Sequence, residues 1–156
     1  MKFDVQIEGA ERAQQALDTV RGRITAGVRE AITRAAIDLT RWVKERKLSD
    51  QVLRVQTGRL RRSVTHRVET YGDRTEGFVG TNVGYGRVHE FGFKGNVNVR
   101  AHARNIKGKK IAVRAHARKM DIPKRAFLRP SLQERWPVYE RWIAKATKDA
   151  VDASRP

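Results

Sequence analysis

The chain has 156 residues, the size of one ordinary domain, and 39% of them are hydrophobic, which is enough for one compact core. It contains no cysteine, so disulfides and thiolate metal sites are excluded, and we expect folding in a reducing cytoplasm. No apolar run has the length of a membrane helix and no secretion signal is recognisable, so we expect no membrane partner.

The net charge is +17, from 34 Lys and Arg against 17 Asp and Glu. Such a charge repels itself in the compact state and favours a polyanionic partner, of which nucleic acid is the first candidate. An arginine-rich proteome would also raise the average charge. The charge is unevenly spread, however, which favours a specific role for the most basic segment.

The N-terminal third predicts a strand and then a long helix. Phe3, Val5 and Ile7 alternate with polar residues, which is typical of a half-buried strand over residues 2–8. From Ala10 to about Lys47 the apolar residues recur every three or four positions, as on one face of a long amphipathic helix. Glycines inside this helix weaken it, so a bend or break near residues 22–27 is expected.

The next elements are shorter. Residues 48–56 fit either a helical tail or a loop. Residues 59–71 favour a strand because β-branched residues are frequent, although the four-residue spacing of Leu60, Val64 and Val68 also fits a helix. Residues 72–74 predict a hairpin turn, 75–83 the returning strand, and 84–92 a loop with one helical turn closed by glycine.

An internal near-repeat follows. Residues 99–104, Val-Arg-Ala-His-Ala-Arg, recur letter for letter at 113–118. Two like-patterned strands around a Gly-Lys turn predict a β-hairpin, which we place as an arm over residues 94–120 within a single domain spanning 1–156. Residues 121–123 should end the arm. A second helix is expected over about 131–152, with Pro137 separating its first turn or kinking it.

The arm is the most basic part of the chain. Between residues 91 and 125 there are eleven basic residues and one acid, Asp121. The predicted contact residues of the arm are Arg100, Arg104, Lys107, Lys109, Lys110, Arg114 and Arg118. On a regular strand, residues four apart share a face, so Arg100 with Arg104 and Arg114 with Arg118 would form a row suited to phosphate contacts. Contact with acidic patches of a neighbouring subunit is the alternative.

The predicted fold class is α+β, with the long N-terminal and the C-terminal helix packed on a small antiparallel sheet from which the basic hairpin arm projects. No catalytic constellation is visible: His89-Glu90 is an adjacent pair that should serve packing or hydrogen bonding, and no phosphate-binding glycine loop is present. His102 and His116 could face each other across the arm, but a metal ion there would sit among positive charges. We therefore expect neither an enzyme nor a cofactor.

Three motifs in series, spread over residues 57–132, resemble the tail-component family of long-tailed bacteriophages: Thr-Gly-Arg-Leu-Arg-Arg-Ser-Val from 57, Val-Gly-Thr-Asn-Val-Gly-Tyr-Gly-Arg-Val-His-Glu-Phe-Gly from 79, and Ile-Pro-Lys-Arg-Ala-Phe-Leu-Arg-Pro-Ser-Leu from 122. The residues that carry the resemblance are Thr57, Gly58, Leu60, Gly80, Tyr85, His89, Glu90, Phe91, Gly92, Pro123, Phe127 and Leu128. A related virion-morphogenesis family of contractile-tailed phages shares the early motifs and ranks second. The chain departs from the first family at Gly86, where Ala is usual, and at residues 124–127.

The resemblance implies a structural virion protein at the neck or top of the tail. It would form a ring, expected to be hexameric, that completes the tail and joins it to the capsid connector around the DNA channel. The implied partners are further copies of itself, a tail terminator or tail tube protein, a head-completion or connector protein, and non-specific contact with genomic DNA. The rival hypotheses are a free basic DNA-binding protein that uses the arm for phosphate contacts, and a toxin-like nuclease, for which metal-binding acids are lacking.

Overall fold

The computed structural model describes residues 9–49, 51–106 and 108–154. The predicted strand over residues 2–8 and the arm residue Lys107 lie outside this part of the chain. The elements are, in chain order, α1 (Ala10–Arg46), α2 (Arg59–Ser63), β1 (Val64–Tyr71), β2 (Arg74–Thr81), α3 (Gly84–Phe91), β3 (Phe93–Val99), β4 (His102–Ile106), β5 (Lys109–Val113), β6 (His116–Ile122) and α4 (Arg129–Asp152). The α+β class is confirmed, with each strand paired to one other in antiparallel hairpins or ribbons.

Helix α1 is the longest element, and α4, β1 and β2 all pack against it. Its 37 residues run without the predicted break near residues 22–27 and extend about 55 Å at 1.5 Å per residue. Its C-terminal half carries the buried residues, from Ala31 to Val43, whereas residues 10–19 are exposed all round. The apolar periodicity therefore predicted the helix correctly, but not that residues 10–19 are left uncovered by the described part of the chain.

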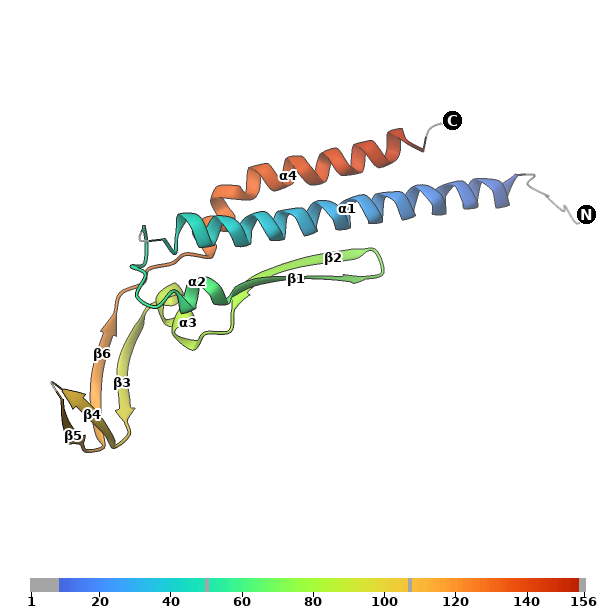
Figure 1. Cartoon of the computed structure of the whole chain (residues 1–156). Coiled ribbons are helices and arrows are strands. Elements are labelled where there is room, and N and C mark those ends of the chain that lie inside the picture. Colours follow the sequence, from blue (N-terminus) through green and yellow to red (C-terminus); the bar gives the residue numbers. More distant parts are fainter. Residues whose placement is uncertain (1–8, 50, 107, 155–156) are drawn as a thin grey trace, which may run out of the picture.

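Helix α4 packs along one side of α1, and the β1–β2 hairpin lies on the other side (Figure 1). Asp38 of α1 accepts hydrogen bonds from Arg135 Nε and from the Tyr139 hydroxyl, each at 2.9 Å. Burial, and then this contact with the carboxylate, raises the pKa of Tyr139 above its usual range. The helix continues through Pro137, so the predicted separate first turn does not form.

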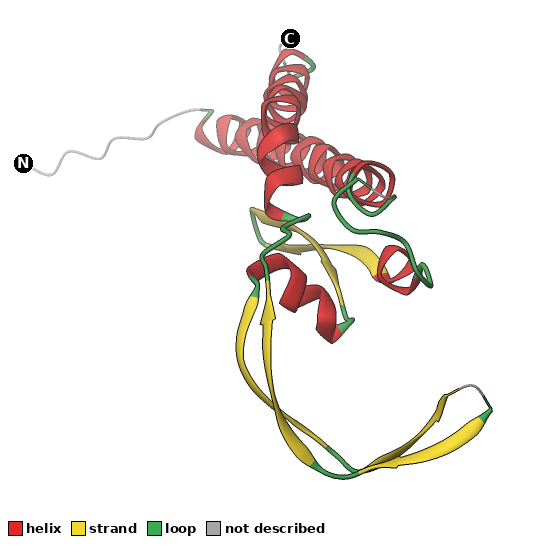
Figure 2. Ribbon diagram, turned by 90° about the vertical axis from the view of Figure 1, so that its left-hand side faces the viewer, coloured by secondary structure: helices red, strands yellow, loops and turns green. Residues whose placement is uncertain are grey.

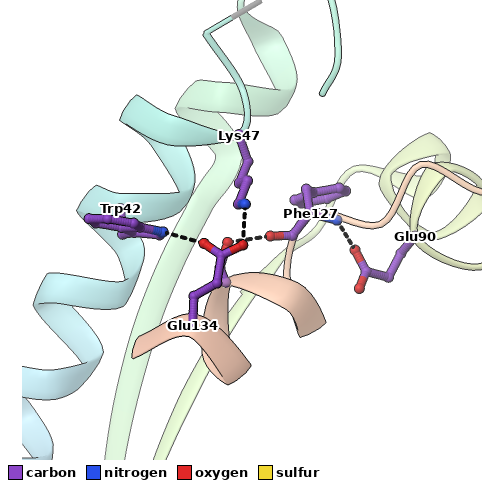
Figure 3. A network of polar contacts seen from close by, with 6 residues as sticks. Trp42, Lys47, Glu90, Phe127 and Glu134 are labelled. Atoms are coloured by element: carbon purple, nitrogen blue, oxygen red, sulfur yellow. Dashed lines mark hydrogen bonds and ion pairs between the residues drawn. The ribbon is translucent and has the colours of Figure 1, made fainter. Parts of the chain in front are cut away.

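A second polar contact joins α1 to α4 near the start of α4 (Figure 3). The Glu134 carboxylate accepts hydrogen bonds from Lys47 Nζ at 2.6 Å and from Trp42 Nε1 at 3.3 Å. The hydrogen bond from Lys47 lowers the pKa of Glu134 despite partial desolvation. This contact fixes the start of α4 beside the end of α1.

The segment 59–71 is a helical turn followed by a strand, which corrects the prediction of one strand over its whole length. α2 occupies residues 59–63 and β1 begins at Val64, so the two readings of the Leu60–Val64–Val68 spacing each hold for one part. The predicted turn and returning strand are confirmed, with Tyr71 opposite Arg74 in the register. An added Cβ at Gly77 would lie 3.1 Å from Ile32 Cγ2, so this glycine lets β2 approach α1 closely.

The core lies where α1, α2, β1, α4 and the loop after α1 converge. Its buried members are Leu39, Val43, Leu48, Leu53, Leu60, Val64, Phe127 and Tyr139. Phe127 has an exposed fraction of 0% and is the largest fully buried side chain. It belongs to the segment that connects β6 to α4, so this connection is anchored in the core rather than lying on the surface.

Strands β3 to β6 form an arm that leaves the body at the end opposite the N-terminus of α1 (Figures 1 and 2). Figure 2 shows that the arm is bent, with β3–β6 as its inner part and β4–β5 curling back as its outer part. The molecule is therefore elongated, with a helical body and a curved two-stranded projection.

Replacing Phe127 by Ala should lower the free energy of unfolding by about 3–5 kcal/mol, because a fully buried ring leaves a cavity in the core. The matched control is Phe91→Ala, whose ring is 70% exposed and whose loss should change the stability by less than about 0.5 kcal/mol. Urea denaturation followed by circular dichroism measures both. Equal effects of the two substitutions would contradict this assignment of the core.

Candidate functional site

The arm consists of two antiparallel strand pairs, β3–β6 and β4–β5, that are separated by a bend but keep one continuous pairing register. In the inner part Val99 lies opposite His116, and in the outer part His102 lies opposite Val113. Both strands advance three residues between these pairs, so the register passes through the bend without a bulge. The observed arm spans residues 93–122, slightly more than the predicted 94–120, and it ends before Pro123 as expected.

The bend lies within the two copies of the near-repeat, residues 99–104 and 113–118. The strands are interrupted at residues 100–101 and 114–115, which are the Arg-Ala of each copy. In both copies a histidine Nδ1 lies 2.9 Å from the backbone oxygen of the arginine two residues earlier, His102 with Arg100 and His116 with Arg114. Because the copies face each other in antiparallel strands, the same short sequence makes the same turn on both sides.

This bend interrupts the strands on which the row of guanidinium groups was predicted. Arg100 and Arg114 lie in the interruptions, while Arg104 belongs to β4 and Arg118 to β6. The basic residues are thus distributed along a curve and not on one flat face. The two histidines do not face each other across the arm either, because each is opposite a valine.

The arm's positive charges are nearly all uncompensated within the described residues. The one ion pair found on the described part of the arm joins Lys94 Nζ to Asp121 at 3.6 Å, close to the body. All described residues of β4 and β5 are exposed except the half-buried Val113. Such a surface is available to an anionic partner along most of its length.

The outer ribbon also presents apolar side chains. Ile106 lies opposite Lys109 and Ile111 opposite Arg104, so these four residues share one face. Ile106 is 41% exposed and Ile111 is 47% exposed. The charges of this ribbon were predicted from the sequence and the exposed isoleucines were not, although both isoleucines stand in the strand pattern.

The arm is fixed to the body by the carboxylate of Glu90, at the end of α3. Its Oε2 accepts a hydrogen bond from the backbone N–H of Phe127 at 2.8 Å (Figure 3). The same oxygen accepts one from Leu128 N–H at 2.9 Å, and Oε1 accepts one from Arg129 N–H at 2.9 Å. These groups lie at the N-terminus of α4, where backbone N–H groups have no partner within the helix. Glu90 is buried, and the three donors satisfy a charge that would otherwise be costly to remove from water.

Two neighbouring motif residues, His89 and Gly92, also contact the segment that connects the arm to α4. The His89 backbone oxygen accepts a hydrogen bond from Arg125 N at 2.8 Å. Gly92 has φ +78° and its missing Cβ would lie 3.2 Å from Lys124 N, so glycine is needed where α3 turns into the arm beside residues 122–124. Glu90 thus contributes its carboxylate and His89 its backbone oxygen to this junction.

Gly86 is explained by its packing. A Cβ at this position would be 2.7 Å from Thr81 Cγ2 and 3.1 Å from Leu60 Cδ1. The departure from the usual alanine therefore goes with a closer approach of α3 to α2 and β2. By contrast, nothing lies within 4 Å of a Cβ built at Gly80, so its place in the motif has no steric explanation here.

The remaining motif residues divide into buried and exposed ones. Leu60 and Phe127 belong to the core and Leu128 packs against it. Gly58 has φ +66° before α2, and the Thr57 backbone oxygen accepts a hydrogen bond from Arg62 at 3.0 Å. Tyr85 contacts His89 edge-to-face at 6.2 Å, and Tyr85, Phe91 and Pro123 are exposed. Most of the resemblance thus marks the framework that holds the arm.

A second basic surface was missed by the sequence analysis. An open pocket of ≈ 440 Å³ between the loop after α1 and α3 is lined by Arg54, Arg59, Arg61 and Arg125, together with His89. The cluster Arg59-Leu60-Arg61-Arg62 was a visible signal, but the predicted strand would have placed these residues on alternating faces. The body therefore adds positive charge near the base of the arm.

The described residues contain no group of three or more His, Cys, Asp and Glu side chains that could hold a metal ion. In the same residues no helix has the length and apolar character needed to cross a membrane.

Comparison with known families gives one match. The family model described as the phage virion morphogenesis family matches residues 33–144, which extend from α1 through the whole arm into α4. The sequence motifs indicated this virion-morphogenesis family as the second possibility, after the tail-component family. No curated protein and no solved structure matches the chain significantly.

Replacing Glu90 by Ala should lower the free energy of unfolding by about 2–4 kcal/mol, because three backbone N–H groups lose a charged acceptor. Glu90→Gln keeps one acceptor oxygen and should have a smaller effect. Urea denaturation gives the stability, and hydrogen exchange should show faster exchange at Phe127, Leu128 and Arg129. The control Glu140→Gln changes an exposed carboxylate on α4. An unchanged exchange rate at the three amides would contradict the assigned role of Glu90.

Proposed function

Because the chain belongs to the phage virion morphogenesis family, we propose that it is a non-enzymatic ring subunit at the head–tail junction of the virion. The family membership gives the protein a structural role in building the virion. The finer proposal is that copies form a ring, with a hexamer as the expected stoichiometry, that completes the tail and joins it to the capsid connector around the DNA channel.

The observation that carries this proposal is the arm. A curved, exposed, cationic ribbon is held rigidly at its base by Glu90 and Gly92 but contacts little of its own body along its length. A lone chain gains nothing from such a projection, which costs conformational entropy without burying apolar surface. In an assembly the ribbon can reach a neighbouring subunit, and its charge can face the genomic DNA that passes through the channel.

The partners that follow from this proposal are further copies of the chain, a tail terminator or tail tube protein, and a head-completion or connector protein. Contact with DNA would be non-specific, because arginine and lysine on an exposed ribbon bind phosphates, which carry no sequence information. The basic pocket formed by Arg54, Arg59, Arg61 and Arg125 lies near the base of the arm and would enlarge the same cationic surface.

Reversing four charges of the arm, with Arg100, Arg104, Arg114 and Arg118 all changed to Glu, should abolish infectious particles while the monomer stays folded. The arm contributes no residue to the main core, so the thermal transition should move little. The measurement is complementation of a phage that lacks this gene, together with circular dichroism of the purified variant.

A matched control reverses four exposed charges of the body away from the basic pocket, Arg29, Arg87, Arg141 and Lys148. It changes the net charge by the same amount and should retain more infectivity than the arm variant. Full infectivity of the arm variant would refute the importance of the arm.

The rival function, a free DNA-binding protein, is favoured by the same exposed ribbon. It predicts that the isolated monomer binds duplex DNA at sub-micromolar concentration and that the affinity falls steeply with salt. Electron microscopy of the concentrated protein separates the two hypotheses, since rings support the virion subunit. Tight DNA binding by a protein that stays monomeric at every concentration would support the rival.

A further inference from the structure

The face of the outer ribbon β4–β5 that carries Ile106 and Ile111 combines apolar and basic side chains, so phosphate groups would contact only part of it. The two isoleucines are diagonal neighbours, and Arg104 and Lys109 lie directly opposite them on the partner strands. Both isoleucines are more than 40% exposed and belong to β4 and β5, the outer part of the arm. A partner surface that matches this face would offer an apolar strip beside acidic groups.

The chain itself has such a strip. In the N-terminal half of α1, Leu17, Val20, Ile24 and Val28 line an open groove of ≈ 400 Å³, whose other wall includes Asp73 in the β1–β2 turn. Leu17 is 69% exposed. The residues are spaced by three or four positions, so they form one stripe along the helix.

The first turns of α1 carry a local excess of acidic residues, while Arg23, farther along the helix, contacts Ala153 and Ser154 at the C-terminal end of α4. Over residues 10–20 the helix carries Glu11 and Asp18 against one basic residue, Arg12, in a chain whose net charge is +17. Glu11 and Asp18 are seven residues apart and therefore lie on the same side of the helix, beside the apolar stripe. Arg21 also lines the groove, and its ion pair with Asp73 on the opposite wall leaves these two residues without net charge.

The two surfaces cannot meet within one chain. The arm projects at one end of the elongated molecule, and the exposed half of α1 extends at the other end (Figure 1). A contact between them must join two copies head to tail. Repetition of such a heterologous contact yields a ring if the rotation closes.

We propose that the tip of the arm of one copy docks into the α1 groove of the next copy, with Ile106 and Ile111 on the Leu17–Val20–Ile24 stripe and Arg104 and Lys109 beside Glu11 and Asp18. This inference rests on the proposed ring and identifies the surfaces that build it. The charges steer the approach and set the direction of the contact, while the apolar side chains supply the buried area.

The absence of cysteine from the natural sequence makes the contact directly testable by disulfide trapping. Two single-cysteine proteins, Ile106→Cys and Leu17→Cys, are mixed under mild oxidation, one of them with a tag that changes its mass. We expect a mixed disulfide dimer. The matched control pairs Ile106→Cys with Ile37→Cys, whose side chain is 50% exposed on the C-terminal half of α1 and which should not be trapped.

A charge exchange tests the electrostatic part of the proposal. Arg104→Glu with Lys109→Glu in the Ile106→Cys protein should strongly reduce trapping. Glu11→Lys with Asp18→Lys in the Leu17→Cys protein should restore it, because the charges are again opposite. Circular dichroism of each variant verifies that it folds.

The outcomes separate this inference from the proposed function. Rings in electron micrographs of the unaltered protein, without trapping between positions 106 and 17, would overturn the docking contact and leave the ring standing. A chain that shows neither rings nor trapping would overturn both. If a fluorophore at position 106 responds to duplex DNA and no trapping occurs, the tip binds phosphate and the docking contact is wrong.

Discussion

A carboxylate that accepts three backbone hydrogen bonds determines how the arm stands on the body. Glu90 closes α3, and its three donors belong to the segment that leads from the arm into α4. The same segment places Phe127 in the core, so a polar contact and an apolar contact fix one short piece of backbone. The direction of the arm follows from this junction, because β3 and β6 both begin or end within a few residues of it.

The elements with a strong local pattern could be predicted, and those that depend on distant partners could not. The period of α1, the β1–β2 turn and the end of the arm before Pro123 were all evident from local sequence. The segment 59–71 was wrong in its first five residues, because the exposed arginines around Leu60 give no signal that distinguishes a helical turn from a strand. The function of Glu90 was not predictable in detail, since its donors come from nearly 40 residues later in the chain.

For the candidate site, composition predicted the charge of the arm, and the letter-for-letter repeat predicted its hairpin. The strand pattern gave no sign that the strands are interrupted at Arg100 and Arg114, whose backbone oxygens each contact the histidine two residues later. The repeat thus encodes a bend as well as a pairing. The motif resemblance pointed to a phage virion protein, and the match over residues 33–144 places the chain in the related family.

The arm consists of paired strands whose outer sides have no third strand among the described residues. Unprotected strand edges invite pairing with another chain, and soluble proteins commonly guard them with lysine and arginine. Here the density of cations makes two arms repel each other in solution, so uncontrolled polymerisation through the arms is suppressed. The charge of the arm therefore also protects its exposed strand edges from pairing with another arm.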